Sequence, residues 1–302
     1  MNTDAGNIST PGSLRERIVI YGRMIKFSHT IFALPFALAA VVLANRHTPA
    51  SLYGISWILV AMIAARSAAM GFNRIVDAKI DAKNPRTSMR EIPAGKLSQK
   101  SALIFETISA LVFILAAAML GHLCLVLSVP VLAVLCLYSY TKRFTWLAHL
   151  YLGFAISLAP LGTWIALTNS FYWPILLLSF ALMTYITGFD ILYACQDTRF
   201  DKREGLFSIP AQFGVKKALM AARSVHFISW GFLLWFGHAF DLGLIYFCTA
   251  LLIGVLLIVE HRLVQPDDLT KIDLAFFNVN STISVMLFLG ILVDELTRIW
   301  KI

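Results

Sequence analysis

Long apolar runs, separated by short polar or charged segments, constrain the fold of this chain more than any other feature. We count nine runs of roughly 18–25 residues, each long enough for a helix to cross the hydrocarbon core of a bilayer. They cover residues 24–45, 52–76, 101–120, 123–140, 146–168, 172–195, 218–238, 241–260 and 272–296. Of the 302 residues, 59% are hydrophobic and only 14% are charged, whereas soluble domains contain about 25% charged residues. The sequence therefore predicts an all-α polytopic membrane protein with nine transmembrane helices.

The basic residues are distributed asymmetrically about these runs. Among the 25 lysines and arginines, only Arg46, Arg298 and Lys301 fall on the side opposite the N-terminus, and Arg66 lies inside a run. Loops rich in Lys and Arg stay on the cytoplasmic side of a membrane. We therefore expect the N-terminus and the charged loops to face the cytoplasm, most simply at a bacterial plasma (inner) membrane. The net charge of +8 follows from this topology, and no nucleic-acid partner is expected.

One domain is expected. Residues 1–20 are polar and predict a flexible cytoplasmic tail, and residues 21–302 predict a single nine-helix domain. The four cysteines are scattered through apolar segments without metal-ligand spacing, so we expect free, buried thiols. No shared ligand spacing indicates a histidine metal site or haem ligation among His29, His122, His149 and His226.

An acid-bearing segment ends the second apolar run, where Asn73, Asp77 and Asp81 follow one another at intervals of four residues. On a helix this spacing makes one short stripe. Carboxylates near a bilayer are costly and commonly functional, and Mg²⁺ prefers carboxylates together with phosphate oxygens and water. The stripe predicts a divalent-cation site that holds an anionic substrate, most simply a pyrophosphate. Ordinary helix-end acids paired with nearby lysines are the alternative.

A second acid-bearing segment ends the sixth run, with Asp197 and Asp201 at the same spacing. These two acids can face the first stripe across one ligand. Asp190 and Tyr193 lie one to two turns deeper in the same run. A deep carboxylate can accept a phenolic proton or orient a hydroxyl, although an interhelical hydrogen bond also explains Asp190.

Basic side chains follow these acids. Arg86 and Arg90 lie in a proline-containing turn region after the first stripe, and guanidinium groups bind phosphate in a bidentate manner; contact with lipid headgroups is the alternative. Tyr138 and Lys142 share one helix face, which alone indicates an interfacial tyrosine and a snorkelling lysine.

Two further basic residues lie within or near the first apolar runs. A mid-membrane arginine such as Arg66 should face a polar interior. It can neutralise the acids or hold the carboxylate of an aromatic acceptor, and the sequence does not separate these roles. Lys26, together with His29, is a weaker candidate for substrate contact.

Taken together, these motifs resemble the UbiA superfamily of intramembrane aromatic prenyltransferases, specifically the 4-hydroxybenzoate polyprenyltransferase type. The resemblance covers nearly the whole chain. The matching motifs are Asn73-x-x-x-Asp77-x-x-x-Asp81, Asp197-x-x-x-Asp201, Tyr138-x-x-x-Lys142, and the loop residues Gly205, Ser208 and Pro210. Many members carry an acid directly after the first Asn, where this chain has Arg74.

The resemblance implies nine helices around a central polar cavity that opens to the cytoplasm. It implies a Mg²⁺-dependent transfer of a polyprenyl group from polyprenyl pyrophosphate to a ring carbon of a hydroxylated aromatic acid, in ubiquinone biosynthesis. Metal binding is expected from Asn73, Asp77, Asp81, Asp197 and Asp201; catalytic roles from Asp190, Lys142 and Arg86; and substrate contacts from Arg66, Arg90, Tyr138, Tyr193 and Lys26.

Three alternatives stay open. The stretches 81–87 and 188–193 resemble a bacterial subgroup whose acceptor is a dihydroxynaphthoate of menaquinone synthesis. A CDP-alcohol phosphotransferase also carries membrane Asp motifs, but the Asp-Gly pair of that pattern is missing here. A cation-coupled transporter favours acids at the bilayer midplane, whereas these acids lie at the ends of runs.

Overall fold

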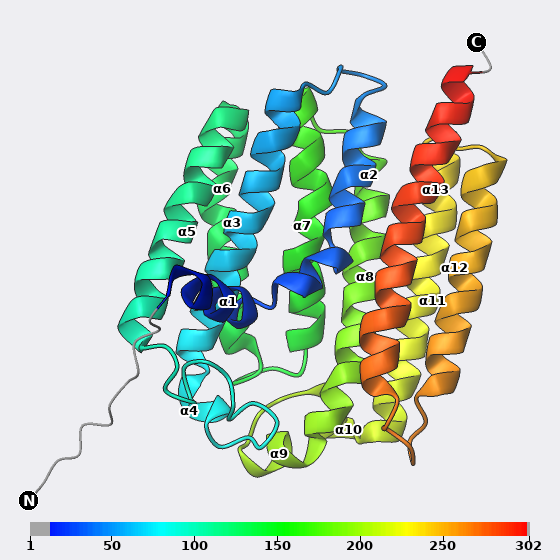
Figure 1. The fold of residues 1–302 in the computed structure, drawn as a ribbon. Helices are drawn as coiled ribbons and strands as arrows, with labels where there is room; N and C mark the ends of the chain where they lie inside the picture. The colour runs from blue at the N-terminus through cyan, green and yellow to red at the C-terminus, as the bar shows by residue number, and fades with distance from the viewer. Residues whose placement is uncertain (1–12, 301–302) are drawn as a thin grey trace, which may run out of the picture.

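The computed structural model describes residues 13–300, which form helices and loops with one isolated β-bridge between Gln265 and Asp268 (Figure 1). The all-helical prediction is confirmed. Eight of the described segments are long and apolar enough to cross a membrane. Their helices are α3 (Leu52–Val76), α5 (Gln99–Leu120), α6 (His122–Thr141), α7 (Ala148–Thr168), α8 (Ile175–Ala194), α11 (Val215–Ala239), α12 (Leu244–Leu263) and α13 (Asn280–Trp300).

The predicted count of nine long spans is not confirmed, because the run 24–45 is broken. It contains the 3-10 helix η1 (Phe27–Phe32) and the 11-residue helix α2 (Leu34–Ala44). Lys26 adopts a left-handed conformation with φ of 47°, which interrupts a right-handed helix. Pro35, the second residue of α2, has no backbone N–H that could bond to a preceding turn. The first segment is therefore too short and too irregular to form one long helix.

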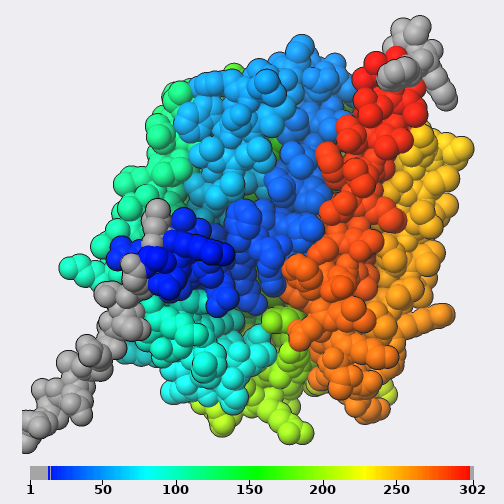
Figure 2. Space-filling view, viewed as in Figure 1, coloured from blue at the N-terminus to red at the C-terminus, as the bar shows by residue number. Residues whose placement is uncertain are grey.

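The predicted tail, residues 1–20, is partly helical. Its residues 1–12 lie outside the described part of the chain, but α1 (Leu14–Met24) begins within it. The Ser13 hydroxyl accepts from the Glu16 backbone N–H, and the Glu16 carboxylate accepts from the Ser13 N–H, which together form a capping box. The ring of Tyr21 stacks on Phe105 at 4.7 Å. In Figure 2, α1 lies against the front face of the bundle, beside the segment that follows α3.

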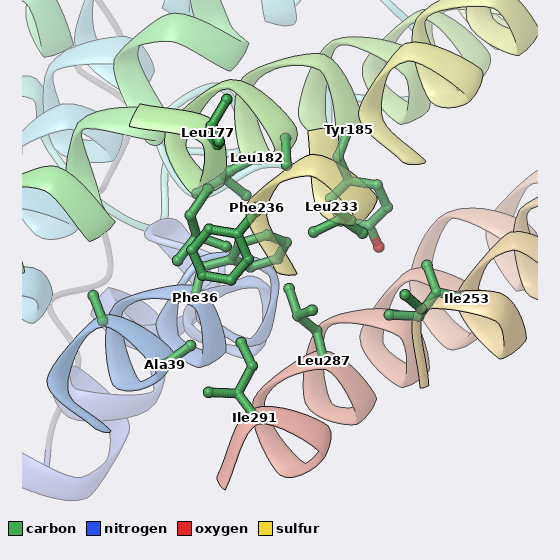
Figure 3. Close-up of a cluster of buried hydrophobic side chains, with 14 of the residues drawn as sticks. Phe36, Ala39, Leu177, Leu182, Tyr185, Leu233, Phe236, Ile253, Leu287 and Ile291 are labelled. Atoms are coloured by element: carbon green, nitrogen blue, oxygen red, sulfur yellow. The ribbon is translucent and has the colours of Figure 1, made fainter. Parts of the chain in front are cut away.

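The main hydrophobic core lies where α2, α8, α11, α12 and α13 meet (Figure 3). Phe36, Tyr185, Phe236, Ile253 and Leu287 are all buried there. Helix α8 is the most enclosed of the long helices, which explains why its sequence is apolar all round. The other side of α8 packs on α7, and α3 packs on α5.

Short elements gather at one end of the bundle, the lower end in Figure 1. They are α4 (Ala78–Asp81), η2 (Cys195–Asp197), α9 (Thr198–Arg203) and α10 (Ile209–Phe213). A π-helical turn, η3 (Leu274–Val279), precedes α13. Elements α4, η2 and α9 belong to the charged segments that follow α3 and α8 in the sequence.

Candidate active site

The first acid segment follows the end of α3 with little break in the helical hydrogen bonding. Asn73 belongs to α3, Asp77 lies between α3 and α4, and Asp81 ends α4. The backbone N–H of Asp77 donates to the Asn73 carbonyl at 2.9 Å, and that of Asp81 to the Asp77 carbonyl at 2.8 Å. The four-residue spacing thus keeps its helical geometry across the junction.

The second segment also continues its helix. Asp190 and Tyr193 belong to α8, Asp197 is the last residue of the 3-10 turn η2, and Asp201 lies in α9. The Ser208 hydroxyl donates to the buried Asp201 carboxylate at 2.8 Å. This bond joins α9 to the N-terminus of α10.

A guanidinium group joins the two segments directly. Arg86, in the turn region after α4, donates to both carboxylate oxygens of Asp197, with 2.9 Å from Nε to Oδ1. Its Nη1 also donates to the Tyr193 hydroxyl at 2.8 Å. The Asn84 amide adds a bond of 3.1 Å to Asp197 Oδ1. The polar segment after α3 therefore lies against the segment after α8.

Other cations neutralise the first segment. Arg90 Nη1 lies 2.7 Å from each carboxylate oxygen of Asp81. Asp77 accepts from Arg143 Nη2 at 3.0 Å and from the Asn73 amide at 3.0 Å. Lys142 Nζ lies 3.9 Å from the second oxygen of Asp77. In this array of charged groups, Asp77, Asp81 and Asp197 each face at least one cation.

A histidine supports the deepest carboxylate. His149 on α7 lies with Nδ1 2.7 Å from Asp190 Oδ2, while its Nε2 accepts from the Ile209 backbone N–H at 3.3 Å. Because the backbone N–H can only donate, Nε2 carries no proton and Nδ1–H donates to Asp190. One oxygen of Asp190 is therefore fixed by His149, and the other stays available for a substrate.

An elongated cavity of about 490 Å³ leads away from this array. Apolar side chains of α3, α6 and α7 form most of its wall, so the expected polar cavity is polar mainly at one end. Polar groups from the sequence-predicted set line that end: Lys26, Arg66, Asn73, Arg90, Tyr138, Asp190 and Tyr193. A second cavity of about 350 Å³ adjoins it, and Arg86, Arg74 and Gln196 line it. Among the described residues, Asp77, Asp81, Asp197 and Asp201 line neither cavity and lie behind the cations.

Two arginines of α3 hold the N-terminal segment over the cavity. Arg66 donates to the Lys26 carbonyl at 2.9 Å, and the buried Arg74 donates to the Met24 carbonyl at 3.0 Å. The Nε of Arg66 is buried without a hydrogen-bond partner. Arg66 forms no ion pair with the acids within residues 13–300, which leaves it available to an anion in the cavity.

Burial and neighbouring charge alter the protonation of the residues between α1 and α2. Burial, together with the guanidinium groups of Arg90, Arg74, Arg86 and Arg66, lowers the pKa of Lys26 to about 8. Burial and the nearby Lys26 lower the pKa of His29 to about 3, so this ring is neutral. His29 lines the cavity as a neutral polar group.

Sequence reasoning missed three residues that complete the site. They are Arg143, which follows α6, Asn84 in the turn after α4, and His149 on α7. Each acts through a residue more than 40 positions away. No local spacing reports such contacts, so only the fold reveals them.

Comparison with known proteins gives a consistent result. The UbiA prenyltransferase family model matches residues 33–282. The 4-hydroxybenzoate octaprenyltransferase of Vibrio vulnificus (strain CMCP6) is 26% identical over 281 residues, which cover 92% of this chain and 98% of that protein. The protein of the same name from Nitrosomonas europaea is 29% identical over 290 residues, which cover 94% and 97%.

Solved structures share the fold. A UbiA homolog from Aeropyrum pernix K1, in an apo structure, is 30% identical with a TM-score of 0.80, covering 88% of this chain and 98% of that one. A UbiA homolog from Archaeoglobus fulgidus bound to GPP and Mg²⁺ has a TM-score of 0.70 at 16% identity, covering 91% and 99%. At 16% identity, the similarity to the Archaeoglobus fulgidus structure shows only that the fold is shared.

Proposed function

Because the chain belongs to the UbiA prenyltransferase family, we propose that it transfers a polyprenyl group from polyprenyl pyrophosphate to a ring carbon of a hydroxylated aromatic acid of the 4-hydroxybenzoate type. The names of the bacterial relatives support this acceptor. The observation that carries the proposal is the bond from Arg86 to Asp197. This bond joins the two acid segments, and Arg86 and Arg90, which pair with them, line the polar end of the apolar cavity and the adjoining cavity, which supports binding of a diphosphate with a long hydrocarbon tail.

The donor atoms fit Mg²⁺. Asn73, Asp77, Asp81, Asp197 and Asp201 all offer hard oxygen ligands. In this structure Asp77, Asp81 and Asp197 already bind positive charge, because each pairs with an arginine. We propose that these five residues hold Mg²⁺ when the diphosphate enters, and a related fold solved with GPP and Mg²⁺ supports this. The ion would neutralise charge on the diphosphate oxygens.

In this proposal two arginines and one lysine also bind the diphosphate. Arg86, Arg90 and Lys142 now pair with Asp197, Asp81 and Asp77. With the carboxylates engaged in holding the ion, Arg86, Arg90 and Lys142 would turn to the oxygens of the diphosphate. Fixed positive charge stabilises the negative charge that develops on the leaving oxygens. The C–O bond to the allylic carbon breaks, and its electron pair leaves with the diphosphate.

The aromatic acceptor then supplies the electrons for the new bond. A ring carbon attacks the allylic cation, and the proton on that carbon is lost to restore aromaticity. Asp190 orients or deprotonates the phenol through the oxygen that His149 leaves free. Tyr138 and Tyr193 line the same cavity, and tyrosine ring faces stabilise a nearby cation.

The acceptor carboxylate needs a cation of its own. Arg66 lines the cavity, and its buried Nε lacks a partner. We assign Arg66 to the carboxylate of the aromatic acid, and Lys26, with its ammonium 5.6 Å from the Tyr193 ring centroid, to the diphosphate end. The asymmetry of lysines and arginines supports a cytoplasmic orientation of this site in a bacterial inner membrane.

Mass spectrometry of products tests the proposal. Membranes that contain the protein are incubated with Mg²⁺, a polyprenyl pyrophosphate and equal amounts of 4-hydroxybenzoate and a dihydroxynaphthoate. Prenylated hydroxybenzoate is the expected product, and prenylated naphthoate alone would reassign the acceptor. Substrate flux into vesicles without any covalent product would overturn the proposal in favour of a transporter.

A further inference from the structure

A second polar cluster lies inside the bundle, away from the acid segments. It consists of His226 on α11 and the neighbours Glu260 and His261 on α12. Within the described residues it is the one group of at least three His, Cys, Asp or Glu side chains whose ligand atoms all lie within 4.8 Å of one another. His226 and Glu260 are fully buried, and His261 is partly buried.

The hydrogen bonding leaves two acceptors facing one another. His226 Nε2 lies 3.1 Å from the Tyr185 carbonyl oxygen, which can only accept, so Nε2 carries the proton. In the neutral ring, Nδ1 then presents a lone pair to Glu260 Oε2 at 3.3 Å and to His261 Nε2 at 3.0 Å. Glu260 Oε2 is buried without a hydrogen-bond partner. No lysine or arginine in residues 13–300 forms an ion pair with this carboxylate.

One proton does not satisfy this arrangement. A proton on His226 Nδ1 serves either His261 or Glu260, a proton on Glu260 Oε2 bonds to His226 Nδ1 and leaves His261 Nε2 without a donor, and a proton on His261 Nε2 leaves Glu260 Oε2 unpaired. A buried carboxylate oxygen without a partner is costly. One cation bound to all three atoms satisfies each of them at once. Metal–ligand distances of about 2.0–2.2 Å place tetrahedral ligand atoms about 3.3 Å apart. His226 Nδ1 lies 3.3 Å from Glu260 Oε2 and 3.0 Å from His261 Nε2, and all three atoms lie within 4.8 Å of one another.

Outer contacts hold two of the three side chains, His226 and Glu260, in the orientation that metal ligands need. The second nitrogen of His226 bonds to a backbone carbonyl, and the second oxygen of Glu260 accepts from the Asn280 amide at 2.8 Å. Such bonds fix the tautomer and the orientation of ligands. A Cβ on Gly188 would lie 2.2 Å from His226 Nε2, so a glycine at this position gives the imidazole its space. This is a built site and not a chance contact.

We propose that His226, Glu260 and His261 bind one divalent transition-metal ion of the Zn²⁺ class. Two imidazoles and one carboxylate suit Zn²⁺ and disfavour Mg²⁺, which selects oxygen ligands. The site would tie α11 and α12 to the start of α13, because Asn280 also donates to the carbonyls of Ala275 and Phe276 in η3, at 3.1 Å each. The Phe276 ring lies 4.3 Å from that of Tyr193 in the cavity wall. The ion would therefore support the cavity without touching the substrate.

Metal analysis of the purified protein tests this proposal. The detergent-solubilised full chain is dialysed against a weak chelator and its zinc is measured by mass spectrometry, before and after addition of Zn²⁺. We expect one zinc per chain in the unchanged protein and less than a tenth of that in Glu260→Gln, which keeps an oxygen for Asn280. His261→Ala, at the partly exposed ligand, should lose zinc as well.

Controls separate this site from the prenyl-transfer site and from misfolding. His238→Ala changes an exposed histidine of the same helix α11, and Asp77→Asn changes the acid segment; both should keep one zinc. Size-exclusion profiles show that each variant is folded. Tetrahedral Co²⁺ absorption should be present in the unchanged protein and absent in Glu260→Gln. Absence of stoichiometric zinc or cobalt in the folded, unchanged protein would overturn the proposal, and so would equal zinc in Glu260→Gln. Neither result depends on whether the chain transfers a prenyl group.

Discussion

The Arg86 guanidinium donates to both carboxylate oxygens of Asp197, a residue 111 positions further along the chain. This contact joins the turn region after α4 to the end of η2. The two residues carry opposite charges, and Arg86 lines the smaller cavity that adjoins the apolar one, so the pair is suited to separate when an anion binds there with its own metal ion.

Replacing Arg86 by alanine should lower kcat for prenyl transfer about 100-fold. Removing one fixed hydrogen-bond donor from the negative charge that develops in a transition state typically lowers kcat by about 10²–10³. Arg86→Lys should recover part of the rate, since lysine keeps the positive charge but lacks the planar guanidinium that donates two parallel hydrogen bonds. Initial rates with saturating Mg²⁺ and both substrates measure the effect. The matched control is Arg199→Ala, an exposed arginine of α9. Similar rates in Arg86→Ala and the control would refute a role in the leaving step.

Asp190→Asn should lower kcat for the aromatic acceptor about 10²–10⁴-fold, the range for loss of a general base. Calorimetric affinity for an unreactive prenyl diphosphate should stay unchanged, because Asp190 faces the acceptor. His149→Gln should give a smaller loss, since His149 acts only through the position of Asp190. A weaker affinity of Asp190→Asn for the diphosphate would show that Asp190 contacts the prenyl diphosphate and not the aromatic acceptor.

The rate should depend on pH through Lys26, whose pKa is lowered to about 8 by burial and by four arginines. Below that pH the side chain is an ammonium and helps to bind the diphosphate. Above it the charge is lost, so KM for the prenyl diphosphate should rise as pH increases from 7 to 9, measured from initial rates at each pH. Lys26→Arg keeps its charge over this range and should remove the rise. The same slope in both proteins would assign the titration to another group.

The contact between α7 and α8 should be sensitive at Gly153. A Cβ there would lie 2.2 Å from the Met183 carbonyl oxygen and 2.4 Å from Thr187 Oγ1. Gly153→Ala should therefore lower stability by about 1–3 kcal/mol, as overpacking typically does, and lower the Tm in detergent. Gly162→Ala on the same helix has open space around its Cβ and is the control. An unchanged Tm in Gly153→Ala would show that α7 and α8 separate easily.

Much of the fold was predictable because the apolar runs report helices directly. Run 52–76 is α3 to the residue, and six further runs agree with their helices within three positions at each end. The last run, 272–296, covers η3 and most of α13. The first run failed because hydrophobicity does not report the left-handed backbone of Lys26. A run of apolar residues indicates burial or lipid contact, but it does not exclude a break in the helix.

The site was predictable where spacing along one helix sets it, as for Asn73, Asp77 and Asp81. It was not predictable where tertiary contacts set it. Arg143 reaches Asp77 across 66 positions, and His149 reaches Asp190 across 41. Arg66 is similar, because its bond to the Lys26 carbonyl depends on the fold of the segment before α2.

The central claim is that the two acid segments bind one Mg²⁺-diphosphate between them. The most direct test is an experimental structure of the protein with Mg²⁺ and an unreactive prenyl thiodiphosphate. We predict metal ions between the diphosphate and carboxylates of both segments, at least one from Asp77 or Asp81 and one from Asp197 or Asp201, with Arg86 moved from Asp197 to the phosphate. A diphosphate held by one segment alone, with the Arg86–Asp197 pair intact, would contradict the account.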